Sequence, residues 1–289
     1  MQKSSLHTHT VFCDGHDDIE AFCQAAWAGG FASLGFSAHA PFTKKTNIPS
    51  DWHLSEDRLE EYIQAVRAAR LRWEGRLQVY LGLEVDYVAG LIGPADGDYA
   101  ELGLDYIIGS VHVVLSPQGE PFIVDDSQEE FQEGFAAFFH RDKDALLDAY
   151  CTAIEEMIAA GGYSILGHLD LIKKNNAPSP WFSPLEEGYM RRMRRLAILA
   201  GESSGVVEIN TGGLARGYTK DTYPSVEILQ LLCEQGVPIT VNLDAHRVGH
   251  LQGYHEIAWD TLRRSGYTRV QVIAGSTAGI PQWREEDLF

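Results

Sequence analysis

Apolar runs alternate with segments of helical periodicity along most of the chain. Runs typical of strands lie at 3–8, 32–38, 78–86, 105–114, 163–168, 205–210, 237–243 and 268–274. Segments with helical spacing lie near 17–29, 56–73, 142–160, 185–201, 224–235 and 253–265. This order predicts a parallel sheet, and so many units without a glycine-rich phosphate loop favour a closed α/β barrel over an open sheet.

Two segments interrupt the alternation. Thr43–Leu54 is polar and contains proline, and Leu115–Arg141 carries two prolines and adjacent aspartates among aromatic residues. Both are typical of loops, and we expect them to lie over one face of the barrel. Because neither an internal repeat nor a linker divides the chain, residues 1–289 are predicted to form a single domain with insertions near 43–54 and 115–141.

The amino-acid composition limits the kinds of molecule that the protein is expected to bind. The 289 residues are 45% hydrophobic, enough for one large core, and 23 Lys+Arg against 41 Asp+Glu give a net charge of −18. That charge argues against nucleic acid and anionic membrane surfaces as partners. We see no apolar leader or membrane-spanning run, and the four cysteines lack CxxC spacing, so they are expected to be free thiols. We expect a cytoplasmic monomer or homodimer that acts on a small molecule.

Histidines mark the ends of the predicted strands. Six of the eleven fall there: His7, His9, His39, His112, His168 and His246. Since the strands of a parallel barrel all end on one face, these imidazoles are predicted to meet in one pocket. Glu84 and Asp86 end another apolar strand, and Asp170 and Asp244 follow two more. A buried carboxylate needs a charge partner, so the joint pattern predicts a metal site.

Other polar residues near these strands are less decisive. Asp14 and His16 follow the first histidine pair, and either could reach the same pocket. The remaining histidines lie in predicted loops or helices, where we expect solvated side chains: His53, His140, His250 and His255. Arg216 follows a strand end and is the best candidate to grip a phosphate, because a guanidinium can do so in two places. Lesser candidates for the same role are Lys173, Lys174 and Lys220.

Seven segments together resemble the PHP (polymerase and histidinol phosphatase) family, and more closely its histidinol-phosphate phosphatase branch. They are HTHTVFCDG, GFSAHAPF, LGLEVDY, IIGSVH, ILGHLDLIKK, VEINTGGLARGYTKDTYPS and ITVNLDAH. They occur in the family's order and span Leu6 to His246. The resemblance implies a distorted (β/α)7 TIM-like barrel with two to three divalent metal ions at the carboxyl ends of its strands.

The resemblance also implies a role for each ligand. His7, His9, Glu84 and Asp244 would surround one ion, and Glu84 would bridge to a second held by His112 and His168. The third would be held by His39, His246 and either Asp14 or His16. Glu84, Asp244 and His246 would be catalytic together with a metal-bridging hydroxide. The chain departs from the family pattern at this undecided ligand and at Leu243, which replaces a serine.

The implied reaction is hydrolysis of L-histidinol phosphate to L-histidinol and phosphate, a step of histidine biosynthesis, by attack of that hydroxide. Imidazole and carboxylate donors suit zinc, manganese or iron equally. The acidic and aromatic insert around 122–139, with Asp125 and Asp126, could accept the ammonium and imidazole of the substrate. Alternatives are another small phosphate ester, a nucleotide or phosphodiester, or a non-catalytic metal-binding domain. A two-metal amidohydrolase fits the segments poorly.

Overall fold

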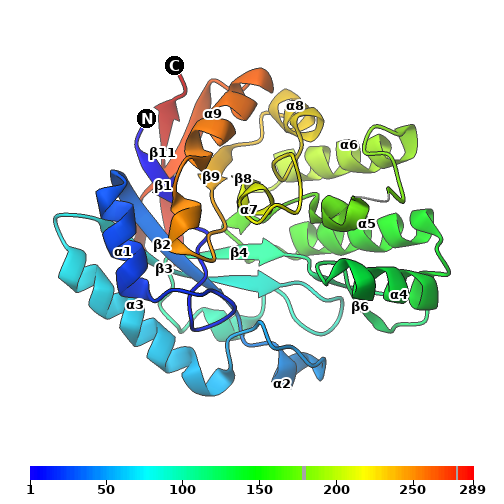
Figure 1. Ribbon diagram of the computed structural model, residues 1–289, viewed down its shortest axis with the longest axis horizontal. Helices are drawn as coiled ribbons and strands as arrows, with labels where there is room; N and C mark the ends of the chain where they lie inside the picture. Colours follow the sequence, from blue (N-terminus) through cyan, green and yellow to red (C-terminus); the bar gives the residue numbers. More distant parts are fainter. Residues whose placement is uncertain (178–179, 278) are drawn as a thin grey trace.

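Seven parallel strands form the centre of the protein in a computed structural model that describes residues 1–177, 180–277 and 279–289 (Figure 1). In order across the sheet they are β1 (Lys3–Ser5), β2 (Phe31–His39), β3 (Gln78–Asp86), β4 (Tyr106–Ser110), β7 (Ile165–Leu166), β8 (Val206–Asn210) and β9 (Ile239–Asn242). Beyond β1, Thr8 forms a parallel bridge with Ala245, and the backbone N–H of His9 donates to Ala245 at 2.9 Å. The first and last strands therefore meet, and the sheet is a nearly closed (β/α)7 barrel.

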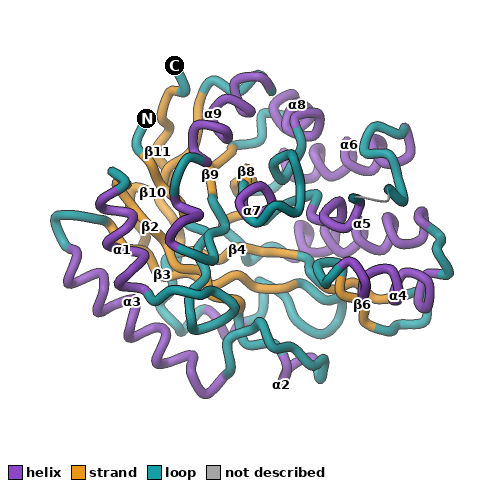
Figure 2. The backbone as a smooth tube through the Cα atoms, in the orientation of Figure 1, coloured by secondary structure: helices purple, strands orange, loops and turns teal. Residues whose placement is uncertain are grey.

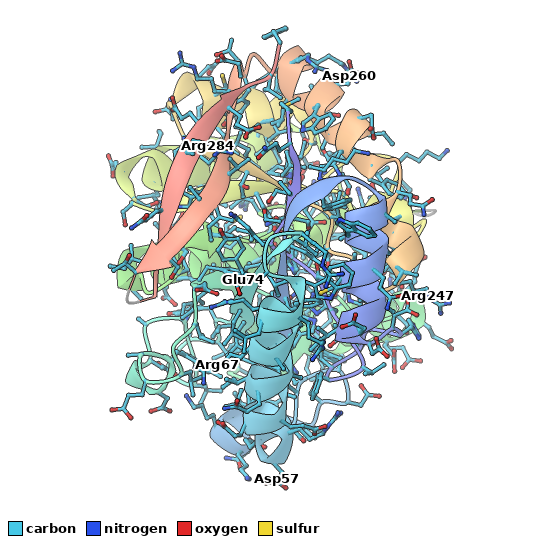
Figure 3. All side chains as sticks on the ribbon, turned by 90° about the vertical axis from the view of Figure 1, so that its left-hand side faces the viewer. Asp57, Arg67, Glu74, Arg247, Asp260 and Arg284 are labelled. Atoms are coloured by element: carbon cyan, nitrogen blue, oxygen red, sulfur yellow. The ribbon has the colours of Figure 1, made fainter. Side chains whose placement is uncertain are left out.

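Helices surround the strands (Figure 2). The long ones are α1 (Ile19–Ala28), α3 (Leu59–Trp73), α4 (Gln128–Phe139), α5 (Lys143–Ala160), α6 (Glu187–Glu202), α8 (Val226–Glu234) and α9 (Tyr254–Arg264); α2 (Thr43–Thr46) and α7 (Gly212–Ala215) are short. Aspartates cap the first turns of two of them. The Asp18 carboxylate accepts the N–H of Ala21 in α1, and the Asp142 carboxylate accepts the N–H of Ala145 in α5. Figure 3 shows α3 from outside, between Asp57 and Glu74. In the described ranges, no helix is long and apolar enough to span a membrane.

The eighth predicted strand does not join the barrel. β10 (Arg269–Thr277) covers the expected residues, but it pairs antiparallel with β11 (Ile280–Asp287) in a separate sheet. Because β1 and β9 already close the barrel, there is no free strand edge for β10 to extend. The hairpin instead packs beside β9, and Ile273 of β10 is buried against Leu6 and Tyr106 of the barrel.

The insertion at 115–141 is ordered, contrary to the expected loop. β5 (Val113–Leu115) and β6 (Pro121–Ile123) form a hairpin, and α4 follows with Ser127 as its N-cap. Phe131, Phe135 and Phe139 recur every four residues on α4 and are buried. The aromatic part of this insertion therefore belongs to the hydrophobic core and does not face a ligand. The spacing of these phenylalanines in the sequence is the signal that predicts this helix.

The barrel interior is filled below its carboxyl end. Tyr106 lies fully buried across the barrel, and its hydroxyl lies 2.5 Å from the carbonyl of Leu6 and 3.0 Å from that of Phe36. A Cβ at Gly35 or Gly82 would lie 2.4 Å from the Tyr106 side chain, so both positions require glycine. This side chain fills the interior below the carboxyl ends of the strands, where the polar residues lie.

Candidate metal centre

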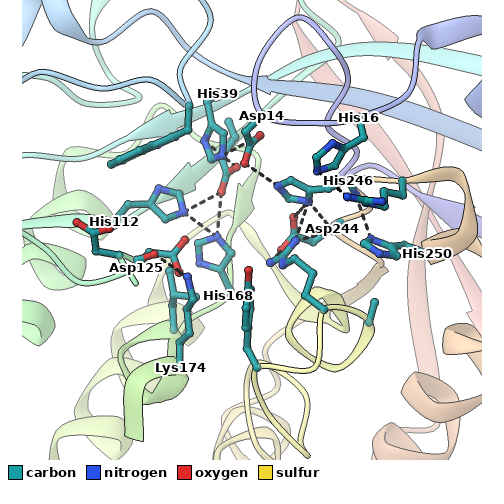
Figure 4. A pocket seen from close by; sticks show the side chains of 18 residues that line it. Asp14, His16, His39, His112, Asp125, His168, Lys174, Asp244, His246 and His250 are labelled. Carbon is teal, nitrogen blue, oxygen red and sulfur yellow. Dashed lines mark hydrogen bonds and ion pairs between the residues drawn. The ribbon is translucent and has the colours of Figure 1, made fainter. Parts of the chain in front are cut away.

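Strand ends bring the predicted ligands together at the mouth of the barrel (Figure 4). His39 and Glu84 are register partners at the ends of β2 and β3. The chain beyond β1 adds His7 and His9, and the loops after the later strands add His112, His168, Asp244 and His246. All of these side chains are buried or nearly so. The sequence prediction that these side chains converge at one mouth agrees with this geometry.

Glu84 lies at the centre of the cluster. One carboxylate oxygen, Oε2, is 3.1 Å from Nε2 of His7, 3.2 Å from Nδ1 of His39 and 3.3 Å from Nε2 of His9. The other, Oε1, is 2.9 Å from Nε2 of His168. Burial alone would raise the pKa of Glu84, but the surrounding imidazoles, His7 and His39 first, hold it well below its usual range. Glu84 is therefore an ionised carboxylate whose two oxygens face different imidazoles of the cluster.

Several ligand atoms in the cluster lack a hydrogen-bond partner among the described residues. They are Nε2 of His7, Nε2 of His9, Nδ1 of His39, Oε2 of Glu84 and Oδ1 of Asp14. A buried polar atom left unpaired costs about 1–3 kcal/mol, so such a concentration calls for a ligand. In the part of the chain that the structure describes, imidazole nitrogens and carboxylate oxygens form four groups whose donor atoms lie within 4.8 Å of one another. This donor set fits divalent metal ions.

Glu208 orients His7 and was not identified from the sequence. It is fully buried on β8, and its Oε2 accepts a hydrogen bond from Nδ1 of His7 at 2.9 Å. This bond places the imidazole proton on Nδ1, so the lone pair of Nε2 faces Glu84. Glu208 also accepts hydrogen bonds from the side chain of Asn242 and the backbone of His168, both at 2.8 Å. The available signal was a glutamate within the apolar run VVEIN.

Asp86 has the same relation to His112. Its Oδ1 accepts from Nδ1 of His112 at 2.9 Å, and its Oδ2 accepts from Nε2 of His53 at 2.8 Å. Burial would lower the pKa of His112, but the carboxylates of Asp86 and Glu84 raise it to about 9. The expectation of a solvated His53 was wrong, since its side chain is only 3% exposed.

His255 was also expected to be solvated, and it is not. It is buried on α9, and its Nε2 donates to the carbonyl of Ser4 at 2.9 Å, at the opposite end of the barrel. Burial lowers the pKa of His255 to about 4. His140 is exposed, and His250 is half-buried at the rim of the metal centre. His255 therefore has a packing role, remote from the cluster.

Asp14 and His16 were alternative candidates for the third ion, and the structure places Asp14 closer to the other ligands. Oδ2 of Asp14 is 3.0 Å from Nε2 of His246, and its Oδ1 is 3.5 Å from Nδ1 of His9 and 3.8 Å from Nε2 of His39. Although burial would raise the pKa of Asp14, His246 and His39 hold it well below its usual range. His16 is exposed on the rim, where its Nε2 lies 3.3 Å from the guanidinium of Arg247.

Asp244 occupies a strained but well-supported position. Its φ of 49° is left-handed, and a Cβ on Gly212 would lie 2.4 Å from its Oδ2, so this close approach requires glycine. Oδ2 accepts a hydrogen bond from Arg216 at 2.8 Å, while Oδ1 lies 3.4 Å from Nε2 of His9. Arg216 also donates to Nδ1 of His246 at 2.7 Å. This arginine therefore orients two of the proposed ligands.

A pocket of about 490 Å³ opens above the cluster. Besides the ligand candidates it is lined by Trp52, Asp125, Asp126, Leu171, Lys174, Ala215, Arg216, Tyr218, Arg247 and His250. Nζ of Lys174 is 2.5 Å from Oδ1 of Asp125 and lies 4.6 Å from the centre of the Tyr218 ring. Three cationic side chains, Lys174, Arg216 and Arg247, thus line a pocket rich in metal ligands, as an anionic substrate requires.

Two lysines proposed for substrate binding lie elsewhere. Lys173 is 7% exposed, and its Nζ binds the buried carboxylate of Asp170 and the carbonyl of Thr222, each at 2.6 Å. Lys220 is exposed and is not part of the pocket lining as described. The 3-10 turn at Leu171–Asn176 points Lys173 inward and Lys174 toward the pocket, so Lys174 replaces both.

The fold and the donor set together define a TIM-like barrel that binds divalent metal at the carboxyl ends of its strands. A family model described as the PHP domain matches residues 5–212. The chain therefore belongs to the PHP family.

Its relatives include proteins of known description. The chain is 30% identical over 247 residues to the "Probable histidinol-phosphatase" of Deinococcus radiodurans, covering 85% of this chain and 86% of the relative. It is 29% identical over 270 residues to the "Histidinol-phosphatase" of Bacillus subtilis, covering 88% and 97%. A crystal structure of histidinol phosphate phosphatase (HISK) from Lactococcus lactis, complexed with zinc, L-histidinol and phosphate, shares the fold: the TM-score is 0.68 at 17% identity, over 97% of this chain and 99% of that one.

Proposed function

We propose that this chain is a histidinol-phosphatase, which hydrolyses L-histidinol phosphate to L-histidinol and inorganic phosphate. The observation that carries the proposal is the 30% identity to a relative of that name across 85% of the chain. The geometry agrees, because imidazole and carboxylate donors converge beneath a pocket with cationic side chains at its mouth. A different small phosphate ester is the second candidate, since the same donors would serve any phosphomonoester.

Two to three divalent ions, of zinc, manganese or iron, would occupy the cluster. The first would lie among His7, His9, Glu84 and Asp244, the second among Glu84, His112 and His168, and the third among Asp14, His39 and His246. The spacing of His7, His9 and Asp244, and that of Asp14, His39 and His246, supports the first and third sets. When bound, such ions neutralise phosphate oxygens and acidify a water molecule to make it nucleophilic near neutral pH.

Arg216 would contribute the remaining positive charge to the phosphate. A guanidinium has five N–H donors, and three of them are used on Oδ2 and the carbonyl of Asp244 and on Nδ1 of His246. Two donors remain, and the side chain, 18% exposed, lines the pocket. Arg216 would thereby hold the phosphate while it keeps Asp244 in place.

The part of the pocket wall formed by Asp125 and Asp126 would bind the alcohol that is released. Asp125 is already paired with Lys174, whereas the Asp126 carboxylate accepts the backbone N–H of Ser127 at 2.8 Å and lines the pocket. Asp126 is therefore the better acceptor for the ammonium group of L-histidinol. The nearby rings of Trp52 and Tyr218 offer apolar and cation–π contacts.

Phosphate release from L-histidinol phosphate tests the proposal directly. We expect kcat/KM near or above ~10⁴ M⁻¹s⁻¹, lost on chelation, restored by manganese or zinc, and well above that for a panel of simple phosphomonoesters. Weak and indiscriminate hydrolysis of the panel would favour the second candidate. Faster cleavage of nucleotides or single-stranded DNA, or metal binding without any hydrolysis, would contradict the proposal.

The Asp126→Asn variant tests substrate selection. It should raise KM for L-histidinol phosphate while leaving turnover of a phosphomonoester of an uncharged alcohol unchanged, because only the former carries an ammonium group. Asp57→Asn, at an exposed position before α3, is the matched control. Unchanged discrimination in Asp126→Asn would remove this assignment and leave the phosphatase activity standing.

A further inference from the structure

A chain of hydrogen bonds runs from the segment between β2 and α3 into the metal centre. Oγ of Ser50 lies 2.6 Å from Nδ1 of His53, and Nε2 of His53 lies 2.8 Å from Oδ2 of Asp86. Oδ1 of Asp86 is 2.9 Å from Nδ1 of His112 and 3.2 Å from its backbone N–H. The side chains of His53, Asp86 and His112 are 3%, 1% and 3% exposed. Bulk water therefore cannot replace these contacts.

The protons in this chain can be assigned from donor chemistry. An ionised carboxylate only accepts, so both ring nitrogens that face Asp86 must carry hydrogen. A neutral His53 then accepts the hydroxyl hydrogen of Ser50 at Nδ1, and the neutral ring of His112, the form that binds metal, has its lone pair on Nε2. That Nε2 lies 3.2 Å from Nε2 of His168 and 3.5 Å from Oε1 of Glu84. The lone pair thus points into the metal centre.

Packing fixes the ring of His53. It stacks on Phe42 with ring centres 4.2 Å apart and planes 6° apart, and the ring centre of His39 lies 5.4 Å away with the two planes at 62°. The backbone N–H of Leu54 donates to the carbonyl of His39 at 3.0 Å, which ties this segment to the end of β2. These contacts hold the ring of His53 in one orientation.

We propose that His53 is a positioning residue of the metal centre. By donating to Asp86 it holds that carboxylate in the rotamer that fixes the tautomer and direction of His112. Glu208 orients His7 directly. His112 is oriented by Asp86, which is held in turn by His53 from the polar 43–54 insertion. Without His53, Oδ2 of Asp86 would be a buried acceptor lacking its donor, and Asp86 would turn away from His112 to find one.

Metal affinity is the primary readout, because it needs no substrate and stands even if the proposed phosphatase activity fails. In His53→Phe we expect about a 10- to 100-fold loss of affinity for one ion, measured by competition with a chromogenic chelator and by metal content. His53→Gln, whose amide nitrogen can still donate to Asp86, should recover most of that affinity. His255→Phe is the control, since it removes a buried histidine at the far end of the barrel.

Activity on L-histidinol phosphate, which rests on the proposed function, should fall in kcat in parallel with metal loss and return at high metal concentration. Nitrogen NMR of the His112 ring should show loss of the Nδ1–H tautomer in His53→Phe alone. If that variant does not fold, Ser50→Ala tests the proposal instead. Loss of one hydrogen bond to His53 should lower the affinity for the same ion about 2- to 10-fold. Wild-type affinity in a folded His53→Phe, or in Ser50→Ala when it stands in, overturns the proposal.

Discussion

Replacing Glu208 by glutamine would test how far the metal centre depends on residues that do not contact metal. The carboxylate accepts hydrogen bonds from Nδ1 of His7, from the side chains of Asn210 and Asn242, and from the backbone of His168. Glutamine has nearly the same shape but only one acceptor atom. Whichever way its amide lies, the NH₂ group faces two donors.

The expected loss follows from those contacts. With NH₂ on the Oε2 side, His7 keeps a partner only by moving its proton to Nε2, which fills the lone pair that faces Glu84 at 3.1 Å. With NH₂ on the Oε1 side, the backbone N–H of His168 loses its acceptor. A hydrogen bond to a charged group contributes about 1.5–3 kcal/mol, or roughly 10- to 150-fold in affinity. We therefore expect Glu208→Gln to bind metal about 10- to 100-fold more weakly.

Competition with a chelator measures this loss, and the thermal midpoint of the metal-free protein shows how much is due to folding. Glu202→Gln, at the exposed end of α6, is the matched control. A Glu208→Gln protein that is folded and binds every ion with wild-type affinity would refute the reasoning. Lower stability with unchanged affinity would make Glu208 a structural residue only.

Three further predictions concern charge and metal. Lys173→Ala leaves the buried carboxylate of Asp170 without its partner, so urea unfolding should show a loss of about 3–5 kcal/mol; an unchanged midpoint and slope would contradict this. Asp14→Ala should lower metal content by one ion per chain while His16→Ala retains it, and the opposite pattern would make His16 the ligand. Chelation should lower the melting temperature in proportion to the ions removed, since they bind only the native state; a melting temperature insensitive to metal would count against a site in the barrel.

The sequence by itself determined that the sheet is parallel and that the candidate metal ligands lie at the carboxyl ends of its strands. Apolar runs and helical spacing are local signals, and in a parallel barrel each strand end must lie on the same face. That rule alone predicts that His39, His112 and His168 converge, although they are far apart in the chain. These histidines could be grouped from the sequence alone, because each follows an apolar run typical of a strand.

Only the tertiary structure decided which side chains complete the site. Barrel closure by the bridge between Thr8 and Ala245 excluded the eighth strand, and one 3-10 turn directed Lys173 inward and Lys174 toward the pocket. The partnerships of Glu208 with His7 and of His53 with Asp86 join residues from separate elements. Such contacts depend on register and side-chain direction across the whole barrel, and local hydrophobic patterns do not encode either.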